Sequence, residues 1–237
     1  MHRIKTPSLL PGFTETVEEI KKKTEDIELD KKWKLRWKKF KKTKFCKKLV
    51  EHLKNNQNSL CAYCEKKITK DNQEIEHFIP KSMSTENYDY TFEFSNLLLC
   101  CRDSQKTGNL SCGQKKKGKD PKETCLNPYT MPDIRLFEGK LVDTGIQLIP
   151  DETACSKAKT DVTLVWSTIK MLKLNTPFLC SQRRVVWKRF EKYIKEARLM
   201  EGAKQTEEKQ KLKSQYQQVQ EYITTIRWTL DNFLNES

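Results

Sequence analysis

The sequence predicts a mainly helical α+β protein, in which a small cysteine-rich insert separates two helical regions. Apolar residues recur at helical spacing near both ends of the chain, which is typical of amphipathic helices. Between them the pattern changes to short apolar stretches and turns, and five of the nine cysteines fall between residues 61 and 112. Only 7 of the 237 residues are glycine, about half the usual share, which argues against a dinucleotide-binding or glycine-rich β fold. We therefore expect a basic helical segment (1–56), the insert (57–125), and a linker with a C-terminal helical region (126–237).

The composition shows a large excess of positive charge. Lys and Arg number 46 against 32 Asp and Glu, a formal net charge of +14. Such an excess favours a polyanionic partner, most often nucleic acid, although it does not distinguish DNA from RNA and is also compatible with simple solubility. The apolar runs are shorter than the roughly 18 residues of a membrane span, and the first residues do not resemble a secretory signal. We expect a soluble, cytoplasmic protein.

The most basic part of the chain is residues 31–48, with eleven Lys or Arg residues and no acidic residue. Trp33, Trp37 and Phe40 are spaced i, i+4, i+7, which predicts an amphipathic helix that continues to about residue 56. Its basic face is either a solvated surface or a surface that contacts the phosphate backbone of nucleic acid. The candidate nucleic-acid-binding residues on this helix are Lys38, Lys39, Lys41 and Lys42.

Local patterns predict three further elements. Thr16 and Glu19 have the spacing of a helix capping box. Ile75–Ile79 is typical of a short strand that Pro80 ends, because proline cannot donate to a strand ladder. Phe137–Val142 suggests a hairpin strand within the linker.

The C-terminal region carries two apolar seams. Apolar residues step by four and three over 186–200 and again over 212–233, which predicts two helices. The polar stretch Glu201–Gln210 is expected to hold the turn between them, giving an antiparallel helical hairpin. Core packing explains such seams, and docking of a partner protein is the alternative.

The cysteine spacing indicates a metal site. Cys61 and Cys64 form a C-x-x-C pair, whose thiolates can reach one tetrahedral zinc from a tight turn. A redox pair of this spacing would need a βαβ context, which the surrounding sequence lacks. Cys112 offers a third ligand, and either Cys100 or Cys101 offers a fourth. Four thiolates would close the site and make the zinc structural; the alternative is that these are ordinary buried cysteines, as we expect for Cys125, Cys155 and Cys180.

His77 is the candidate catalytic residue. It lies between the cysteine pairs and next to Glu76. An imidazole can accept a proton from water near neutral pH, and a carboxylate can bind a divalent cation. Together with basic surroundings, these groups suit hydrolysis of a phosphodiester. A purely structural contact between histidine and glutamate is the alternative.

Four stretches of the insert share a pattern with a known motif. They are Cys61–Glu65, Ile75–Ser82, Asn96–Cys101 and Cys112–Gly118. Together they resemble the zinc-bearing form of the HNH endonuclease motif, and are most similar to the PtuB-type HNH proteins of Septu anti-phage and retron-associated systems. The similarity extends to the flanking stretches Met1–Ile4, Leu53–Cys61, Asn127–Pro128 and Leu172–Asn175.

The resemblance implies a ββα-metal site with a catalytic Mg²⁺ or Mn²⁺ ion. His77 falls on the position of the general base, Asn96 on the position that orients it, and Glu76 on that of an acidic metal ligand. The zinc positions fall on Cys61, Cys64 and Cys112, with Cys101 a better fourth ligand than Cys100.

The motif helix shows a departure from the family. Lys115, Lys116 and Lys117 lie at its start, where contact with phosphate is expected. Gly113 stands where the family usually has an Asn or His ligand of the catalytic metal, and Gln114 is the substitute that the sequence offers.

These implications lead to an expected function with open alternatives. We expect a metal-dependent HNH endonuclease that cleaves DNA as the effector of an anti-phage system, together with a PtuA-like ATPase subunit that docks on the helical hairpin at 186–234. A ribonuclease with the same site, for example one directed at transfer RNA, remains possible on these residues. So do a nuclease for modified DNA and a catalytically inactive, zinc-stapled nucleic-acid-binding module.

Overall fold

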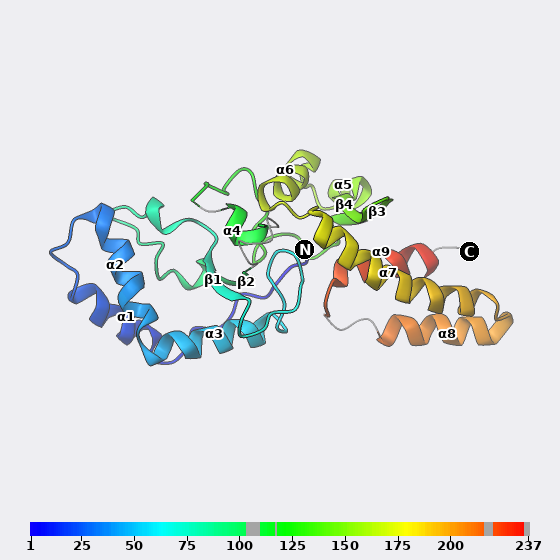
Figure 1. Ribbon diagram of the computed structural model, residues 1–237, viewed down its shortest axis with the longest axis horizontal. Helices are drawn as coiled ribbons and strands as arrows, with labels where there is room; N and C mark the ends of the chain where they lie inside the picture. Colours follow the sequence, from blue (N-terminus) through cyan, green and yellow to red (C-terminus); the bar gives the residue numbers. More distant parts are fainter. Residues whose placement is uncertain (103–109, 117, 216–219, 235–237) are drawn as a thin grey trace.

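The computed structural model describes residues 1–102, 110–116, 118–215 and 220–234. It is a mixed α/β structure in which about half of the residues are helical, and the described strands form two small antiparallel sheets. The molecule is elongated (Figure 1), with the N-terminal helices at one end, the C-terminal helices at the other and the cysteine-rich region between them.

The N-terminal end contains α1 (Phe13–Lys22), α2 (Leu29–Lys41) and α3 (Lys44–Asn56). The capping box expected at Thr16 is wrong, because α1 begins at Phe13 after Gly12, which has a φ of 80°. The Thr16 hydroxyl instead donates to the Gly12 carbonyl oxygen at 2.8 Å. Phe13 and Val17 are both buried, so the apolar stripe requires a helix that already includes Phe13.

The single helix expected to run from residue 31 to 56 is also wrong, because the chain breaks between α2 and α3. Thr43 lies at the break, and its hydroxyl oxygen accepts a hydrogen bond from the Cys46 amide at 3.2 Å. Such a cap starts a new helix. Phe40 before the break and Leu49 after it are both fully buried, so the two helices each have an apolar face in the core.

The cysteine-rich region contains β1 (Gln73–His77), β2 (Leu97–Cys101) and the short helix α4 (Cys112–Lys116). The two strands are antiparallel, with His77 opposite Leu97 and Gln73 opposite Cys101. The expected strand is therefore present but ends at His77. The Ile79 amide does not continue the ladder, because it donates to the Asn96 side-chain oxygen at 2.6 Å. Two short 3₁₀ helices lie between the strands, η1 (Lys81–Met83) and η2 (Phe94–Asn96).

The hairpin predicted around Phe137–Val142 is confirmed. The strand β3 (Phe137–Val142) pairs with β4 (Gly145–Pro150), and α5 (Glu152–Lys157) and α6 (Val162–Leu172) follow. The Asn175 side chain holds β4 by accepting from the Leu148 amide and donating to its carbonyl oxygen, both at 2.8 Å.

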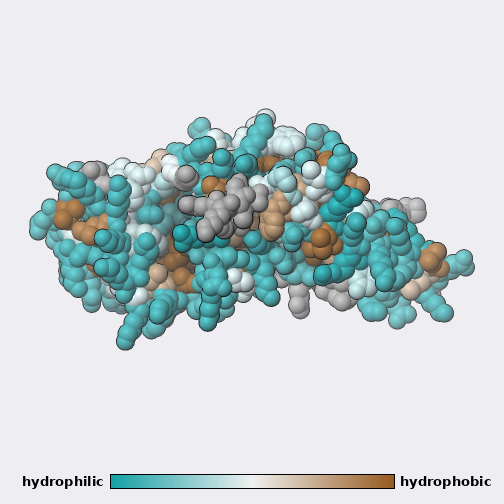
Figure 2. Space-filling view, viewed as in Figure 1, coloured by the Kyte–Doolittle hydropathy of each residue, from teal (hydrophilic) through white to brown (hydrophobic). Residues whose placement is uncertain are grey.

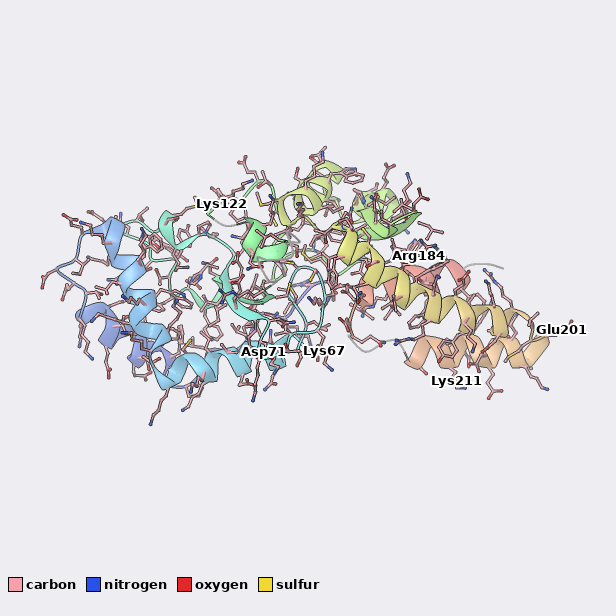
Figure 3. The ribbon with its side chains drawn as sticks, viewed as in Figure 1. Lys67, Asp71, Lys122, Arg184, Glu201 and Lys211 are labelled. Carbon is pink, nitrogen blue, oxygen red and sulfur yellow. The ribbon has the colours of Figure 1, made fainter. Side chains whose placement is uncertain are left out.

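The C-terminal end contains α7 (Pro177–Arg198), α8 (Gly202–Gln215) and α9 (Ile223–Leu234). The turn expected over Glu201–Gln210 is wrong, because most of this stretch belongs to α8. Its Ala, Glu, Lys and Gln residues are good helix formers, and the chain turns near Glu201 at the far tip of the molecule (Figure 3).

The helices α7–α9 bury apolar side chains of their own, apart from the main cluster of the described residues. Arg184 on α7 also donates to the Asp143 carbonyl oxygen at 3.0 Å, which ties this end to the β3–β4 turn. This C-terminal cluster consists of Phe190, Ile194, Ala197, Leu212, Ile223, Ile226, Leu230 and Phe233. Within the described part of the chain, none of the helices is both long enough and apolar enough to cross a bilayer.

Candidate functional site

Four buried cysteines converge from three separate elements. Cys61 and Cys64 lie in the turn after α3, Cys101 ends β2, and Cys112 begins α4. The sulfur atoms all lie within 4.8 Å of one another. The Sγ–Sγ distance is 3.8 Å between Cys61 and Cys112, 3.6 Å between Cys64 and Cys101, and 3.7 Å between Cys101 and Cys112. Tetrahedral zinc with bonds of about 2.3 Å to sulfur requires separations of about 3.8 Å, so this cluster could bind a metal such as zinc.

Backbone hydrogen bonds and one left-handed residue orient these thiols toward one another. The Cys61 amide donates to the Lys66 carbonyl oxygen at 2.9 Å, and the Glu65 amide to the Cys61 carbonyl oxygen at 3.1 Å, which closes the turn. Cys112 has a φ of 55°, a left-handed conformation that costs a non-glycine residue free energy. Adjacent residues of a strand point to opposite faces. Cys101 therefore joins the four-sulfur cluster, while Cys100 is buried outside it and contacts Cys61.

His77, the predicted general base, lies at the end of β1. Its Nε2 is 3.0 Å from the Thr91 carbonyl oxygen, so Nε2 carries the proton and donates. The Nδ1 atom is then left as an acceptor, and the Lys81 ammonium lies 3.3 Å from it. Burial, together with the charge of Lys81, lowers the pKa of His77 well below its usual range. The lowered pKa favours the neutral ring, in which the lone pair of Nδ1 can accept a proton although its basicity is reduced.

The aromatic residues of α2 frame this histidine. The Trp37 ring meets the His77 ring edge-on, with 4.5 Å between centroids and an interplanar angle of 83°. The Lys81 ammonium lies 5.4 Å from the centre of the Trp37 ring and 6.0 Å from that of Trp33. Burial lowers the pKa of Lys81. Lys81 was not among the predicted site residues, because the turn between β1 and η1 that brings it to His77 follows no helical or strand period.

Asn96, expected to orient the histidine, binds backbone groups. Besides accepting from the Ile79 amide, its side-chain nitrogen donates to the Ile79 carbonyl oxygen at 2.9 Å and to that of Tyr90 at 3.0 Å. The adjacent Thr91 carbonyl oxygen is the one that holds His77. Asn96 therefore acts on the ring through the loop that carries Thr91, which the sequence analysis did not identify.

Glu76, the expected acidic ligand, faces α4. One carboxylate oxygen, Oε1, lies 2.9 Å from the Lys116 ammonium. Burial raises the pKa of the Glu76 carboxyl, and Lys116 opposes that shift. A Cβ atom at Gly113 would lie 2.6 Å from Oε2. The Glu76 carboxylate thus occupies the space that a side chain at position 113 would need, which explains the glycine there. Gln114, the other expected ligand, lies half-buried on α4.

The prediction that Lys116 contacts nucleic acid is wrong. Its side chain is fully buried, and its ammonium also donates to the His77 and Phe78 carbonyl oxygens at 3.1 and 2.9 Å. Lys116 therefore fastens α4 to the end of β1. Lys115 is exposed, and Lys117 lies outside the described residues.

The basic surface predicted for α2 adjoins the site. Lys38, Lys41 and Lys42 are exposed and Lys39 is half-buried, while Trp37 on the same helix reaches His77. Hydrophilic side chains cover most of the face shown in Figure 2, including the end formed by α1–α3. A polyanion that lies along this end would thus come close to the histidine.

The sequence of this chain is similar to those of two bacterial proteins. In an alignment 180 residues long, which covers 65% of this chain and 69% of the relative, the sequence is 32% identical to an Escherichia coli protein named as the HNH endonuclease of retron Ec83. It is 31% identical over 144 residues to a Vibrio cholerae protein named as that of retron Vc95, with 58% of this chain and 63% of the relative covered. No protein-family model and no solved structure matches the chain. The chain belongs to the family of these retron HNH endonucleases, which are hydrolases acting on phosphodiester bonds.

Proposed function

We propose that this protein is a metal-dependent endonuclease that cleaves DNA, with β1, β2 and α4 as a ββα-metal site. The observation that carries the proposal is the state of His77. The hydrogen bond from Nε2 to the Thr91 carbonyl oxygen leaves Nδ1 as the acceptor of the ring, 3.3 Å from the Lys81 ammonium. A nuclease needs this combination of a base for water and cationic groups for phosphate.

In the proposed reaction His77 Nδ1 accepts the proton of the attacking water. The Lys81 ammonium is half-buried, so it can approach a phosphate oxygen and stabilise charge that develops there. Moving Lys81 onto the phosphate would also leave Nδ1 available for water. Trp37 packs edge-on against the His77 ring and so limits its rotation, which keeps Nδ1 facing Lys81.

Glu76 is the protein ligand that we propose for the catalytic ion. Mg²⁺ is commonly held by one or two carboxylates, with water and substrate phosphate completing its shell. Glu76 would supply one such ligand by exchanging its ion pair with Lys116 for the ion. When bound, Mg²⁺ or Mn²⁺ would act as a Lewis acid on the phosphate.

The cysteine cluster is proposed to hold a structural zinc. Four thiolates leave no open position for substrate. The cluster joins the turn after α3 to the ends of β2 and α4. It would therefore hold α4, with Lys116 and Gly113, against the Glu76–His77 strand.

The test is cleavage of plasmid DNA and of total RNA by the purified protein, with Mg²⁺, Mn²⁺ or chelator. His77→Ala should lose at least about a hundredfold in rate, the typical contribution of a general base. His52→Ala is the matched control, because His52 lies on α3 and binds the Ser8 carbonyl oxygen. Equal activity of His77→Ala and wild type would contradict the assignment of the base. Metal-dependent cleavage of RNA alone would replace DNA by RNA as the substrate.

We further propose that the protein acts in anti-phage defence with an ATPase subunit. Ile226 and Phe233, which the expected hairpin would have offered to such a subunit, are only 2% exposed and belong to the C-terminal core. Val185, Tyr193 and Leu199 on or after α7 are 57%, 44% and 85% exposed. Tyr193→Glu with Leu199→Glu should therefore abolish co-purification with the ATPase while preserving the fold, and unchanged co-purification would exclude this surface.

A further inference from the structure

We propose that a cavity beside the N-terminal segment is a second binding site, one that takes a phosphate-bearing ligand. The cavity has a volume of about 710 Å³, within the roughly 300–1,000 Å³ of typical small-molecule sites. Arg3, Lys5 and Arg227 line it, and Asp133 is the acidic residue among the described lining residues. The net positive lining suits an oxyanion, and arginine in particular binds phosphate with paired hydrogen bonds.

The wall that carries Arg3 and Lys5 is held by hydrogen bonds at both sides. The Ile4 amide donates to the Pro128 carbonyl oxygen, and the Asn56 side-chain nitrogen donates to the Lys5 carbonyl oxygen, both at 2.8 Å. Ile4 is buried while Arg3 and Lys5 are exposed. The two cationic side chains are therefore presented by an ordered backbone, which reduces the entropy lost on binding.

Further polar side chains complete the lining. His2 belongs to the wall, and its Nδ1 lies 3.0 Å from the Glu65 Oε1 atom. Asn56 and Asn58 offer side-chain amides at the end of α3. Arginines together with amides can hold both the phosphate and the sugar or base of a nucleotide.

This cavity is distinct from the site around His77. Trp37, Lys81, Thr91 and Lys116 contact His77, and none of these four residues lines the cavity. One lining residue nevertheless reaches the catalytic sheet, because the Tyr129 hydroxyl donates to the Leu97 carbonyl oxygen at 2.6 Å. Leu97 pairs with His77. The proposal goes beyond the nuclease function, and its test does not depend on cleavage.

Two sources could supply the phosphate: a free nucleotide or a nucleic-acid strand. The experiment is isothermal titration calorimetry of the full chain carrying His77→Ala, so that nothing is cleaved. The probes are a nucleoside 5′-diphosphate and a six-nucleotide single strand. The test variant is Arg3→Ala with Lys5→Ala. The charge-matched control is Lys188→Ala with Arg189→Ala, two exposed residues of α7.

The expected result is that the test variant binds at least one probe about tenfold more weakly, equivalent to about 1.4 kcal/mol, while the control binds like its parent. Weaker binding of the diphosphate by the test variant identifies a nucleotide site. Weaker binding of the single strand alone identifies a second contact surface for nucleic acid. The proposal is overturned if neither probe binds, or if the test and control variants bind both probes alike.

Discussion

Gly113 shows how one backbone position depends on a side chain from a distant strand. The carboxylate of Glu76 lies so close to α4 that a Cβ atom at position 113 would overlap it. The same carboxylate is held by the buried Lys116 ammonium. Glycine, glutamate and lysine therefore form one interdependent group, and each can be tested separately.

We expect Gly113→Ala to destabilise the protein and to lower its activity. Overpacking costs about 1–3 kcal/mol, whereas the better helix propensity of alanine returns up to about 1 kcal/mol, so the net effect is destabilising. Urea denaturation measures it. Gly118→Ala is the control, because a Cβ atom there meets nothing within 4 Å among the described atoms. In a Glu76→Ala background the penalty should vanish; a penalty that persists there would contradict the clash with Glu76.

We expect Lys116→Met to destabilise the protein by about 3–5 kcal/mol, because it leaves a buried carboxylate without its partner. Lys115→Met, one residue earlier on the exposed face, should change stability by less than about 0.5 kcal/mol. The free energy of unfolding from urea titrations compares the two variants. Similar values for both would show that Lys116 is not buried as described.

At the scale of elements, the cysteine cluster joins three short segments of the chain. Strands β1 and β2 form a two-stranded sheet, and α4 has five residues. Elements this small are marginally stable alone. A metal bound by the four thiols would fasten them together.

Metal content should therefore depend on one of the two adjacent cysteines and not on the other. We expect about one zinc per chain for four thiolates, retained in Cys100→Ala and lost in Cys101→Ala. Elemental analysis after dialysis measures this, and chelator should lower the melting temperature of the wild type. Retention of zinc in Cys101→Ala with loss in Cys100→Ala would reverse the assignment.

Asp89 should make stability depend on pH at the junction between α2 and the loop before η2. Its carboxylate pairs with Arg36 and accepts from the Thr91 amide at 2.9 Å. Burial alone would raise the pKa of Asp89, but the bonds from Thr91 and the charge of Arg36 outweigh burial and lower it. The stabilisation is therefore present at neutral pH and is lost as the pH falls through the lowered pKa.

Asp89→Asn should accordingly be less stable than wild type at pH 7, and the difference should shrink as the pH falls below about 4, near the ordinary pKa of aspartate. Thermal unfolding at a series of pH values follows this. Asp71→Asn is the control, since Asp71 is an exposed residue of the loop before β1 (Figure 3). A constant difference across the series would contradict the ion pair.

At the scale of the whole molecule, charge and shape act together. The elongated chain places the basic α1–α3 end next to the β1–β2 sheet, which carries His77, and the α7–α9 end away from it (Figure 1). Positive charge near the site should bind phosphate without reading sequence, while the far end remains available to another protein.

We expect Lys38→Gln, Lys41→Gln and Lys42→Gln together to weaken nucleic-acid binding in a salt-dependent way. Each lost phosphate contact should lower the slope of log affinity against log salt by about 1. Lys188→Gln, Lys192→Gln and Lys195→Gln on α7 are the charge-matched control. Fluorescence anisotropy in the His77→Ala background measures both sets, and equal slopes would show that α2 is not the contact surface.

Much of the fold followed from local spacing. The cysteine-rich insert, the hairpin at Phe137–Val142 and the helical ends were all predicted. Two errors arose where apolar periodicity alone was used. The helix predicted over 31–56 breaks because Thr43 caps a new helix, and the turn predicted over Glu201–Gln210 is helical because its residues are good helix formers. In the site, His77 and Glu76 were predicted as neighbours, but Thr91 was not, because its contribution is a backbone carbonyl oxygen that any residue type could supply.

The sequence by itself determined which chemical groups are available and how they are spaced: thiols for a metal, an imidazole beside a carboxylate, and an excess of lysine. Only the tertiary structure decided which lysine is buried, which of Cys100 and Cys101 faces the cluster, and which nitrogen of His77 is the acceptor. The physical reason is that spacing fixes neighbours within a turn or a strand. Burial and hydrogen-bond partners instead depend on residues far away in the sequence. Thr91 and Lys116, for example, contact His77 only once the chain has folded.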